Sequence, residues 1–185
     1  SNARLAGRYA KSLLGLAQEQ GQLEVVYADM KYIQAVCNAS SEFVNLLRSP
    51  IIKADQKNSI INSVTKDKVS LLTNSFTVLI VKKGRERDLP EMATTFIEQY
   101  NTLKGIHQVT LTTAVDVSDA LKKSIEDKVK AESKFVTVEL TTKTDDSLIG
   151  GFVLAFNNNL VDVSIARDLR DIKKQFLSNE YIGKI

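Results

Sequence analysis

Residues 101–117 read NTLKGIHQVTLTTAVDV, and inside this stretch the spacing of the apolar side chains changes. Before Gly105 they recur every three to four residues, which is typical of an amphipathic helix. After Gly105 apolar and polar residues alternate as in a half-buried strand, and one face carries Val109, Leu111, Thr113, Val115 and Val117. This change predicts a domain boundary at Gly105, between a helical domain over residues 4–105 and a smaller α/β domain over residues 106–185.

The residues before Gly105 predict an all-α bundle of six helices. Helices are expected over residues 4–20, 22–39, 54–64 and 68–83, with a short one capped by Ser41 and a last one from Leu89. Gly21 and Gly84 are expected to end helices, because glycine readily adopts the left-handed conformation at a helix C-terminus. Residues 1–3 read Ser-Asn-Ala, which resembles the remnant of a cleaved expression tag, so the first helix is expected to begin at Arg4.

The residues after Gly105 predict a β-α-β-β-β-α order, so the fold class is α+β overall. Strands are expected over residues 107–117, 135–140, 148–156 and 160–163, with helices from Ser118 and over residues 164–177. Residues 157–159 are three asparagines, which predict a hairpin turn because asparagine tolerates positive φ. Ser164 is expected to cap the last helix, and Asp162 to order the turn before it.

The composition favours a globular protein without a strongly basic surface. Hydrophobic residues make up 43% of the 185 residues, and 25 Lys and Arg against 22 Asp and Glu give a formal charge of +3. The densest basic stretch is residues 82–87, and Glu86 and Asp88 are expected to dilute it, which argues against a dedicated nucleic-acid binder. One cysteine excludes an internal disulfide, and no apolar run reaches the roughly 18 residues of a membrane span. We expect a soluble, cytoplasmic protein that reaches a membrane only through a partner.

The sequence offers little material for catalysis, metal binding or a cofactor. A phosphate-binding loop of the form GxxxxGK[ST] is absent, and His107 and Cys37, the only residues of their types, fall in different predicted elements. Cys37 lies on an apolar helix face and is interpreted as a core residue. Asp145 and Asp146 have the composition of a turn. The pair Gly150-Gly151 is interpreted as a strand bulge. We therefore expect no cofactor, no metal and no enzymatic activity of the chain itself.

Two of the predicted helices carry more apolar surface than one core-facing stripe needs. In residues 4–20 the apolar and small side chains cover roughly half of the helix circumference, and in residues 68–83 they spread almost all the way round. One interpretation is a deeply buried position inside the bundle. The other is that these two helices frame a groove for an amphipathic partner helix.

Three motifs in order along the chain resemble the delta subunit of the proton-translocating ATP synthase, the bacterial relative of the oligomycin-sensitivity-conferring protein. The first is Arg8-Tyr9-Ala10-Lys11 followed by Leu13, Leu14 and Ala17, although Gly7-Arg8 directly precedes Tyr9 where the family pattern has an intervening residue. The second is Lys82-Lys83-Gly84-Arg85 followed by Leu89-Pro90. The third and strongest is residues 148–152 leading to residues 160–164, then Arg167, Leu169 and Ile172.

The resemblance implies a non-catalytic stator subunit that links the catalytic head to the peripheral stalk, so that rotor torque drives ATP synthesis. It implies that the helical domain binds amphipathic N-terminal helices of alpha subunits, and that the α/β domain binds the C-terminal helix of b-type stalk subunits. It also implies a peripheral position on the cytoplasmic side of the bacterial inner membrane, with no nucleic-acid partner. The candidate partner-binding residues are Tyr9, Phe76, Leu79 and Ile80. The residues interpreted as a structural signature are Gly84, Arg85, Gly150, Gly151, Asp162 and Ser164.

A second interpretation is an RNA-associated or other protein-binding module, which the α/β domain and the slightly basic charge would permit. Sheets that recognise RNA expose aromatic side chains, and the predicted strands carry only Phe135, Phe152 and Phe156. The weak charge asymmetry also argues against this interpretation.

Overall fold

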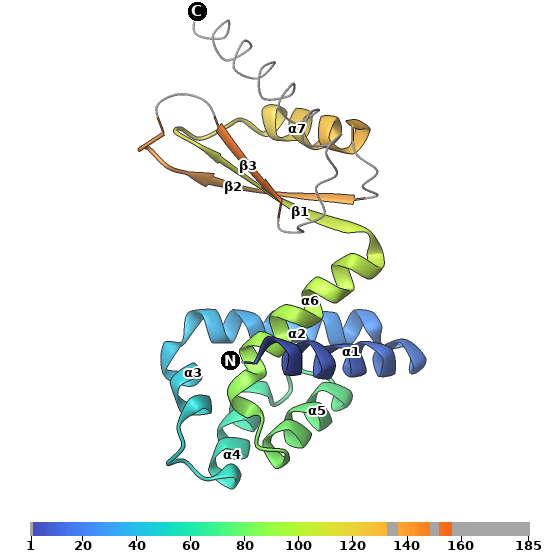
Figure 1. Cartoon of the computed structure of the whole chain (residues 1–185), viewed down its shortest axis with the longest axis vertical. Coiled ribbons are helices and arrows are strands. Elements are labelled where there is room, and N and C mark those ends of the chain that lie inside the picture. Colours follow the sequence, from blue (N-terminus) through green and yellow to red (C-terminus); the bar gives the residue numbers. More distant parts are fainter. Residues whose placement is uncertain (1, 133–136, 149–151, 157–185) are drawn as a thin grey trace, which may run out of the picture. The chain divides into compact units, whose positions relative to one another are not determined.

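The structure, a computed structural model, describes residues 2–132, 137–148 and 152–156 (Figure 1). Over these residues the chain is mixed α and β and mostly helical, with a three-stranded sheet, so the predicted α+β class is confirmed. The chain divides into two compact units, Ser1–Tyr100 and Asn101–Ile185. The division falls in the last turns of the helix that ends just before Gly105.

The first unit is built from helices whose ends are set by caps and glycines. In chain order they are α1 (Ala3–Glu19), α2 (Leu23–Ala39), α3 (Ser41–Arg48), α4 (Ala54–Thr65), α5 (Leu71–Lys82), the short 3-10 helix η1 (Glu86–Asp88) and α6 (Leu89–Lys104). Side chains accept a hydrogen bond from the first turn of α1, α3 and α5, at Asn2, Ser40 and Ser70 respectively. Gly21 and Gly84 have φ of 65° and 69°, as expected for glycines that end helices.

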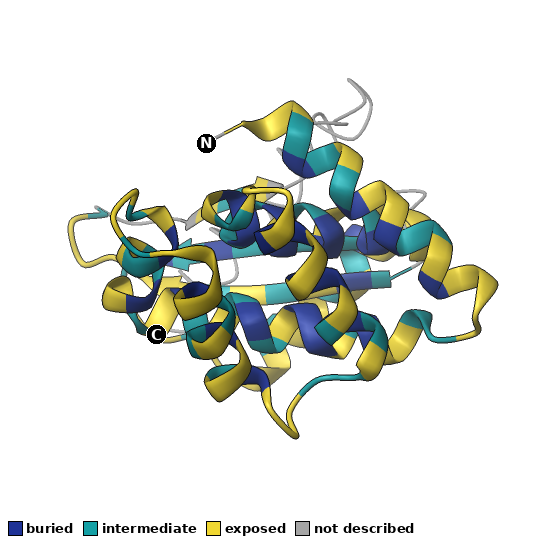
Figure 2. Cartoon of the chain, turned by 90° about the horizontal axis from the view of Figure 1, so that it is seen from below, coloured by how far each residue is buried: buried dark blue, intermediate teal, exposed yellow. Residues whose placement is uncertain are grey.

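The core of this unit lies on the inward faces of its helices, as the burial colouring in Figure 2 shows. α1 presents small residues to that core, namely Ala6, Ala10 and Ala17, which are 0–1% exposed. Small side chains let a helix approach its neighbours closely, so the larger residues come from other helices. The bulkiest fully buried ones include Phe96, Met30, Leu47, Ile80, Leu89 and Met92.

One buried carboxylate fixes the start of α5 to α2. Oδ2 of Asp29, a residue that is 6% exposed, accepts hydrogen bonds from Ser70 N at 2.9 Å, Ser70 Oγ at 2.6 Å and Thr73 Oγ1 at 2.7 Å. A carboxylate at a helix N-terminus is favourable, because unpaired N–H groups and the helix dipole are positive there. The three bonds therefore set both the first turn of α5 and its position against α2.

A buried ion pair draws an acidic residue away from the surface. Lys57 Nζ on α4 donates to Glu86 Oε1 at 2.7 Å and to the Leu47 carbonyl at 2.9 Å, and the two charged side chains are only 6% and 12% exposed. Asp88, also buried, accepts from the Asn2 N–H at 3.3 Å. The expectation that Glu86 and Asp88 dilute the neighbouring basic residues at the surface is therefore wrong, because both acids turn inward.

In the second unit, a helix covers one face of a three-stranded sheet. The elements are β1 (Ile106–Thr113), α7 (Asp119–Glu132), β2 (Thr137–Thr144) and β3 (Phe152–Phe156), and the strand order is β2-β1-β3. β1 pairs with β2 in parallel, Ile106 opposite Thr137, and with β3 antiparallel, Thr113 opposite Phe152. The parallel pair needs a crossover, which α7 supplies. The buried core is made by Val109, Leu111, Ile125, Val129 and Val138.

Several predicted boundaries shift for local reasons. Ser40 rather than Ser41 caps α3, accepting from Phe43 N at 3.1 Å. α5 begins at Leu71 instead of Lys68, because Ser70 caps it and Asp67 adopts a positive φ of 59°. α1 begins at Ala3, so two residues that resemble a tag remnant take part in its first turn.

The predicted strand over residues 107–117 ends early and the next one runs longer. β1 stops at Thr113, and Val115 is 59% exposed, because the chain leaves the sheet before the helix capped by Ser118. β2 extends to Thr144, where β-branched threonines suit a strand. The predicted hairpin turn, the strand over residues 160–163 and the last helix lie outside the described residues.

We predict opposite effects of alanine at two glycines of the first unit. Gly15 lies inside α1, and a Cβ there would meet nothing within 4 Å, so Gly15→Ala should raise the free energy of unfolding by about 0.5–1 kcal/mol. Gly84 has φ of 69°, so Gly84→Ala should lower it by about 1–2 kcal/mol. Urea denaturation of the full chain measures both values. Changes of the same sign would contradict the assignment of helix interior and helix end.

We also predict that α5 depends on its carboxylate anchor. Asp29→Ala leaves three donors without their acceptor and should lower the free energy of unfolding by about 2–4 kcal/mol. Asp29→Asn keeps one acceptor oxygen, so it should lower the free energy of unfolding by less than Asp29→Ala does. Equal losses for the two variants in urea denaturation would show that shape, not hydrogen bonding, is what the site requires.

Candidate functional site

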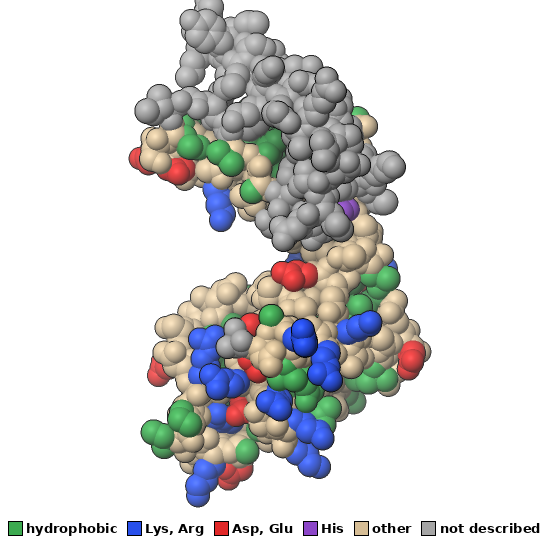
Figure 3. All heavy atoms as spheres, viewed as in Figure 1, with side chains coloured by type: hydrophobic (Ala, Val, Ile, Leu, Met, Phe, Trp, Pro, Cys, Tyr) green, Lys and Arg blue, Asp and Glu red, His purple; other side chains and the backbone are tan. Residues whose placement is uncertain are grey.

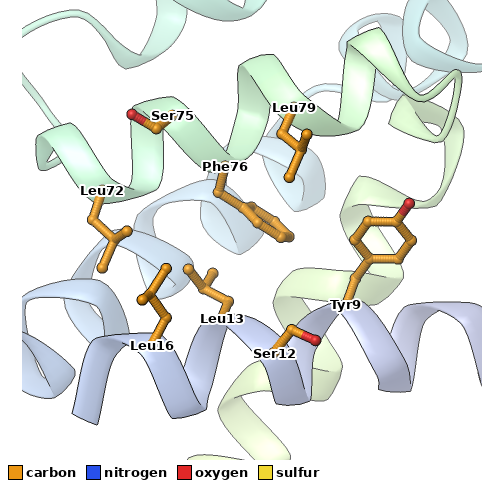
Figure 4. A pocket seen from close by; sticks show the side chains of 8 residues that line it. All are labelled: Tyr9, Ser12, Leu13, Leu16, Leu72, Ser75, Phe76 and Leu79. Atoms are coloured by element: carbon orange, nitrogen blue, oxygen red, sulfur yellow. The ribbon is translucent and has the colours of Figure 1, made fainter. Parts of the chain in front are cut away.

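An apolar groove lies between α1 and α5 in the first unit (Figure 4). Its volume is about 320 Å³, and its lining consists of four leucines, two aromatic residues and two serines. The lining residues are Tyr9, Ser12, Leu13 and Leu16 of α1 and Leu72, Ser75, Phe76 and Leu79 of α5. Figure 3 shows hydrophobic side chains gathered over these helices, with Lys and Arg side chains around them.

Each wall of the groove is one stripe of its helix. The lining residues of α1 stand at positions i, i+3, i+4 and i+7 counted from Tyr9, and those of α5 stand at the same spacing counted from Leu72. Residues at this spacing share one helix face. Figure 4 shows that the walls run in opposite directions, with Tyr9 near Leu79 at one end and Leu16 near Leu72 at the other.

The groove has a buried floor and a partly exposed rim. Leu13 is 3% exposed and Phe76 8%, whereas Leu16 and Leu79 are 40% and 44% exposed. The half-buried ring of Tyr9 meets the Phe76 ring edge-on, with centroids 6.4 Å apart and planes at 66°. Such aromatic geometry is favourable and holds the Tyr9 ring at the rim. An occupant of this groove would therefore meet a rigid apolar floor and cover leucines that water now reaches.

The structure brings together three of the four candidate partner-binding residues. Tyr9, Phe76 and Leu79 line the groove, but Ile80 is 0% exposed and belongs to the core. Ile80 follows Leu79 by one residue and so points about 100° away around the helix. Leu16 and Leu72 were missed as candidates, although their helical spacing from Tyr9 and Phe76 places them on the same helix faces as those two residues.

The wide apolar faces of α1 and α5 now have a structural explanation. α1 directs its alanine stripe into the core and its neighbouring stripe, from Tyr9 to Leu16, into the groove. α5 is not the fully buried central helix that one interpretation expected, because Leu71, Val78 and Leu79 are 85%, 48% and 44% exposed. Each helix thus carries more apolar surface than its own bundle covers.

The remaining single residues have structural roles. Cys37 is buried, as expected, and burial first, then the Glu91 charge, raises the pKa of its thiol to about 11, against an opposing effect of Arg48. Burial lowers the pKa of half-buried His107, which stands in β1 opposite Val138. Asp145 accepts from Ser147 Oγ and Ser147 N, which lowers the pKa of its carboxyl and confirms the predicted turn.

The described residues hold no group of three or more His, Cys, Asp or Glu side chains placed to bind a metal ion. Within the same part of the chain, every helix is too short or too polar to cross a membrane. Of the structural-signature residues, Gly84 closes α5 and exposed Arg85 follows it. Gly150, Gly151, Asp162 and Ser164 lie outside the described residues.

Comparison with known proteins agrees with the resemblance seen in the motifs. The family model described as ATP synthase delta (OSCP) subunit matches residues 5–176. The chain is 36% identical to ATP synthase subunit delta of Cytophaga hutchinsonii, covering 94% of each chain, and 34% identical to that of Amoebophilus asiaticus, covering 98% of each. A chain in the cryo-EM structure of the Toxoplasma gondii mitochondrial ATP synthase hexamer is similar in fold, with a TM-score of 0.69 and 25% identity, covering 94% of this chain and 97% of that one.

Motifs, fold and relatives therefore agree over nearly the whole length, and the predicted family is confirmed. The chain belongs to the ATP synthase delta (OSCP) subunit family, the non-catalytic stator subunits that link the catalytic head of the rotary proton-translocating ATP synthase to its peripheral stalk.

Proposed function

We propose that the groove between α1 and α5 binds an amphipathic N-terminal helix of an alpha subunit, and so attaches this chain to the catalytic head. In this proposal α1 to α6 act as one six-helix bundle. The second unit, completed to a β-α-β-β-β-α order, binds the C-terminal helix of the b-type stalk subunits. The chain acts on the cytoplasmic side of the bacterial plasma membrane, and reaches that membrane through the complex.

The observation that carries the proposal is the apolar groove with half-exposed leucines at its rim. Recognition of a helix in a groove uses apolar anchors at i, i+3, i+4 and i+7 on the bound helix, and the groove walls have the same periodicity. Fully burying an exposed leucine side chain contributes about 1.5–3 kcal/mol. Since Leu16 and Leu79 each have 40–44% of their area left to cover, about 1 kcal/mol from each is available to binding.

The groove has the features that a static link between two proteins needs. A stator holds one protein against another while torque acts on them, so it depends on contact area and on a rigid support. The groove floor is formed by side chains that are at least 92% buried, and α5 is held at its start by Asp29. The family assignment favours this function over the RNA-associated module that the sequence also allowed.

The proposal predicts that the full chain binds a synthetic peptide with the alpha-subunit N-terminal sequence of the same synthase. Binding should release heat in calorimetry, and the peptide should gain helicity in circular dichroism, because its apolar stripe becomes covered by the groove. The affinity should fall only about threefold between 50 and 500 mM salt, whereas binding to nucleic acid falls by orders of magnitude over such a range. Neither heat nor helicity gain would contradict the proposal.

Two neighbouring residues of α5 offer a matched test of where that peptide binds. Leu79 and Val78 are 44% and 48% exposed, but only Leu79 lines the groove. Leu79→Asp should weaken peptide binding at least about thirtyfold, because it places a charge on the apolar contact, and Val78→Asp should change it less than about threefold. Equal effects of the two substitutions in titration calorimetry would place the peptide elsewhere.

At the other wall, Tyr9→Ala should weaken peptide binding about tenfold while leaving the fold intact, because the half-buried ring lies at the rim and contacts Phe76. Circular dichroism and calorimetry measure the two effects separately. Unchanged affinity would remove Tyr9 from the contact, and an unfolded variant would place its ring in the core.

A further inference from the structure

The two walls of the groove are nearly equivalent, so the apolar contacts alone do not select the direction of a bound helix. Each wall has the same four positions, with a serine at i+3 and apolar or aromatic residues at the others. The two walls run in opposite directions (Figure 4). A bound helix that is turned end over end within the groove therefore meets nearly the same side chains as before. Some other feature must distinguish the two ends.

Helix dipoles distinguish the two ends less than full side-chain charges do, because each helix terminus carries only about half a charge. The end beside Tyr9 and Leu79 combines the N-terminal half of α1 with the C-terminal end of α5, and the end beside Leu16 and Leu72 combines the reverse. Helix N-termini carry about half a positive charge and C-termini about half a negative charge, so the two contributions oppose each other at both ends. Full side-chain charges therefore dominate the electrostatic difference between the two ends of the groove.

Those side-chain charges differ between the ends. Lys82 and Lys83 follow Leu79 by three and four residues, so they continue its stripe by one turn, and both are exposed. Arg8, also exposed, precedes Ser12 of the other wall by one turn, and Ser12 Oγ donates to its carbonyl at 3.0 Å. We call Arg8, Lys82 and Lys83 the basic end of the groove.

The acidic residues that follow the basic end in the chain do not cancel it at the surface. Glu86 is paired with Lys57 at 2.7 Å and its side chain is 12% exposed, while Asp88 is 3% exposed. Arg85 and Arg87, which alternate with them, are exposed. The fold has thus sorted the charges of residues 82–88, with cations outside and carboxylates inside.

The opposite end has a different balance. The last turn of α1 carries no basic residue and ends in exposed Glu19, and the first turn of α5 is uncharged. Lys68, in the turn before the Ser70 cap, is the nearest cation in the chain on the α5 side. The groove therefore joins two similar apolar walls to one distinctly cationic end.

We infer that the basic end fixes the direction of the helix bound in the groove, so that the carboxylate-rich end of an amphipathic helix lies beside Tyr9 and Leu79. This inference rests on the proposed function and adds to it a determinant of specificity. The occupant it commits to is a helix with one apolar stripe and with acidic side chains concentrated at one end. Opposite charges across a contact set register and direction more than they add affinity.

The test uses the full chain and two versions of the alpha-subunit N-terminal peptide. Each version has its native carboxylates changed to amides, and three glutamates placed either in its first or in its last turn. A nitroxide on the glutamate-bearing end should broaden the NMR methyl signals of Leu79 more than those of Leu72 for both versions, so the two peptides bind in opposite directions. If the nitroxide on the glutamate-bearing end of either version broadened the Leu72 signals more than those of Leu79, the inference would be overturned.

Charge reversal supplies the second measurement. Lys82→Glu with Lys83→Glu should weaken binding of either peptide about tenfold at 50 mM salt and much less at 500 mM, since exposed charge pairs are screened. The matched control, Lys123→Glu with Lys130→Glu on exposed positions of α7, makes the same net change and should alter the affinity less than twofold. Equal effects of the two pairs would also overturn the inference.

The outcomes separate this inference from the function it rests on. The peptides could bind and lose affinity through Leu79→Asp, while their direction and affinity do not depend on the basic end. That result would overturn the inferred direction and leave the proposed function standing. Peptides that the unaltered chain does not bind would overturn the proposed function itself. A chain that dimerises in sedimentation, and becomes monomeric through Leu79→Asp, would show that a second copy fills the groove and would overturn both.

Discussion

The hold of Asp29 on the first turn of α5 is the contact on which the groove depends. One buried oxygen accepts three hydrogen bonds from Ser70 and Thr73, and so ties α5 to α2 at the point where α5 begins. Because a helix is stiff over three turns, fixing its start also sets the direction of the stripe that begins at Leu72. The position of this wall of the groove therefore depends on a polar contact that lies outside the groove.

The same unit keeps its charges in two separate environments. The buried pair of Lys57 and Glu86 joins α4 to η1, and breaking such a pair leaves an uncompensated charge in the protein interior. The ion pair also affects the surface, because a buried Glu86 leaves the positive charges of the basic side chains after Leu79 without this acidic neighbour there. A packing requirement in the core thus shapes the electrostatics of the face that meets a partner.

A stator subunit must resist deformation under torque, and the packing of the described residues suits that task. The groove floor is closely packed, and its rim is the part left for an occupant to cover. The stacked rings of Tyr27 and Tyr100, 3.7 Å apart, together with the bond from Tyr100 to Glu24 at 2.6 Å, join α2 to α6 in the same unit. Each contact adds rigidity where an applied force would otherwise be absorbed by local motion.

Residue order alone was enough to predict the family, the α+β class, the change from helix to strand at Gly105, and the excess of apolar surface on residues 4–20 and 68–83. These features are local, because they depend on residue spacing, on helix caps and on glycines with positive φ. Even so, the cap of α3 was misplaced by one residue, because Ser40 and Ser41 are both good caps. The end of β1 was misplaced because Val115 and Val117 continue the alternation of the strand after the chain has left the sheet.

The packing of the helices determines which apolar residues remain for a partner and which charges remain at the surface. Leu79 and Ile80 are adjacent and equally apolar, yet one lines the groove and the other is fully buried, because they point about 100° apart around α5 and other helices cover only the side of Ile80 completely. Glu86 stands among basic residues in the chain, yet it turns inward to a lysine 29 positions away. Spacing along the chain contains neither fact, since both depend on which helices pack together.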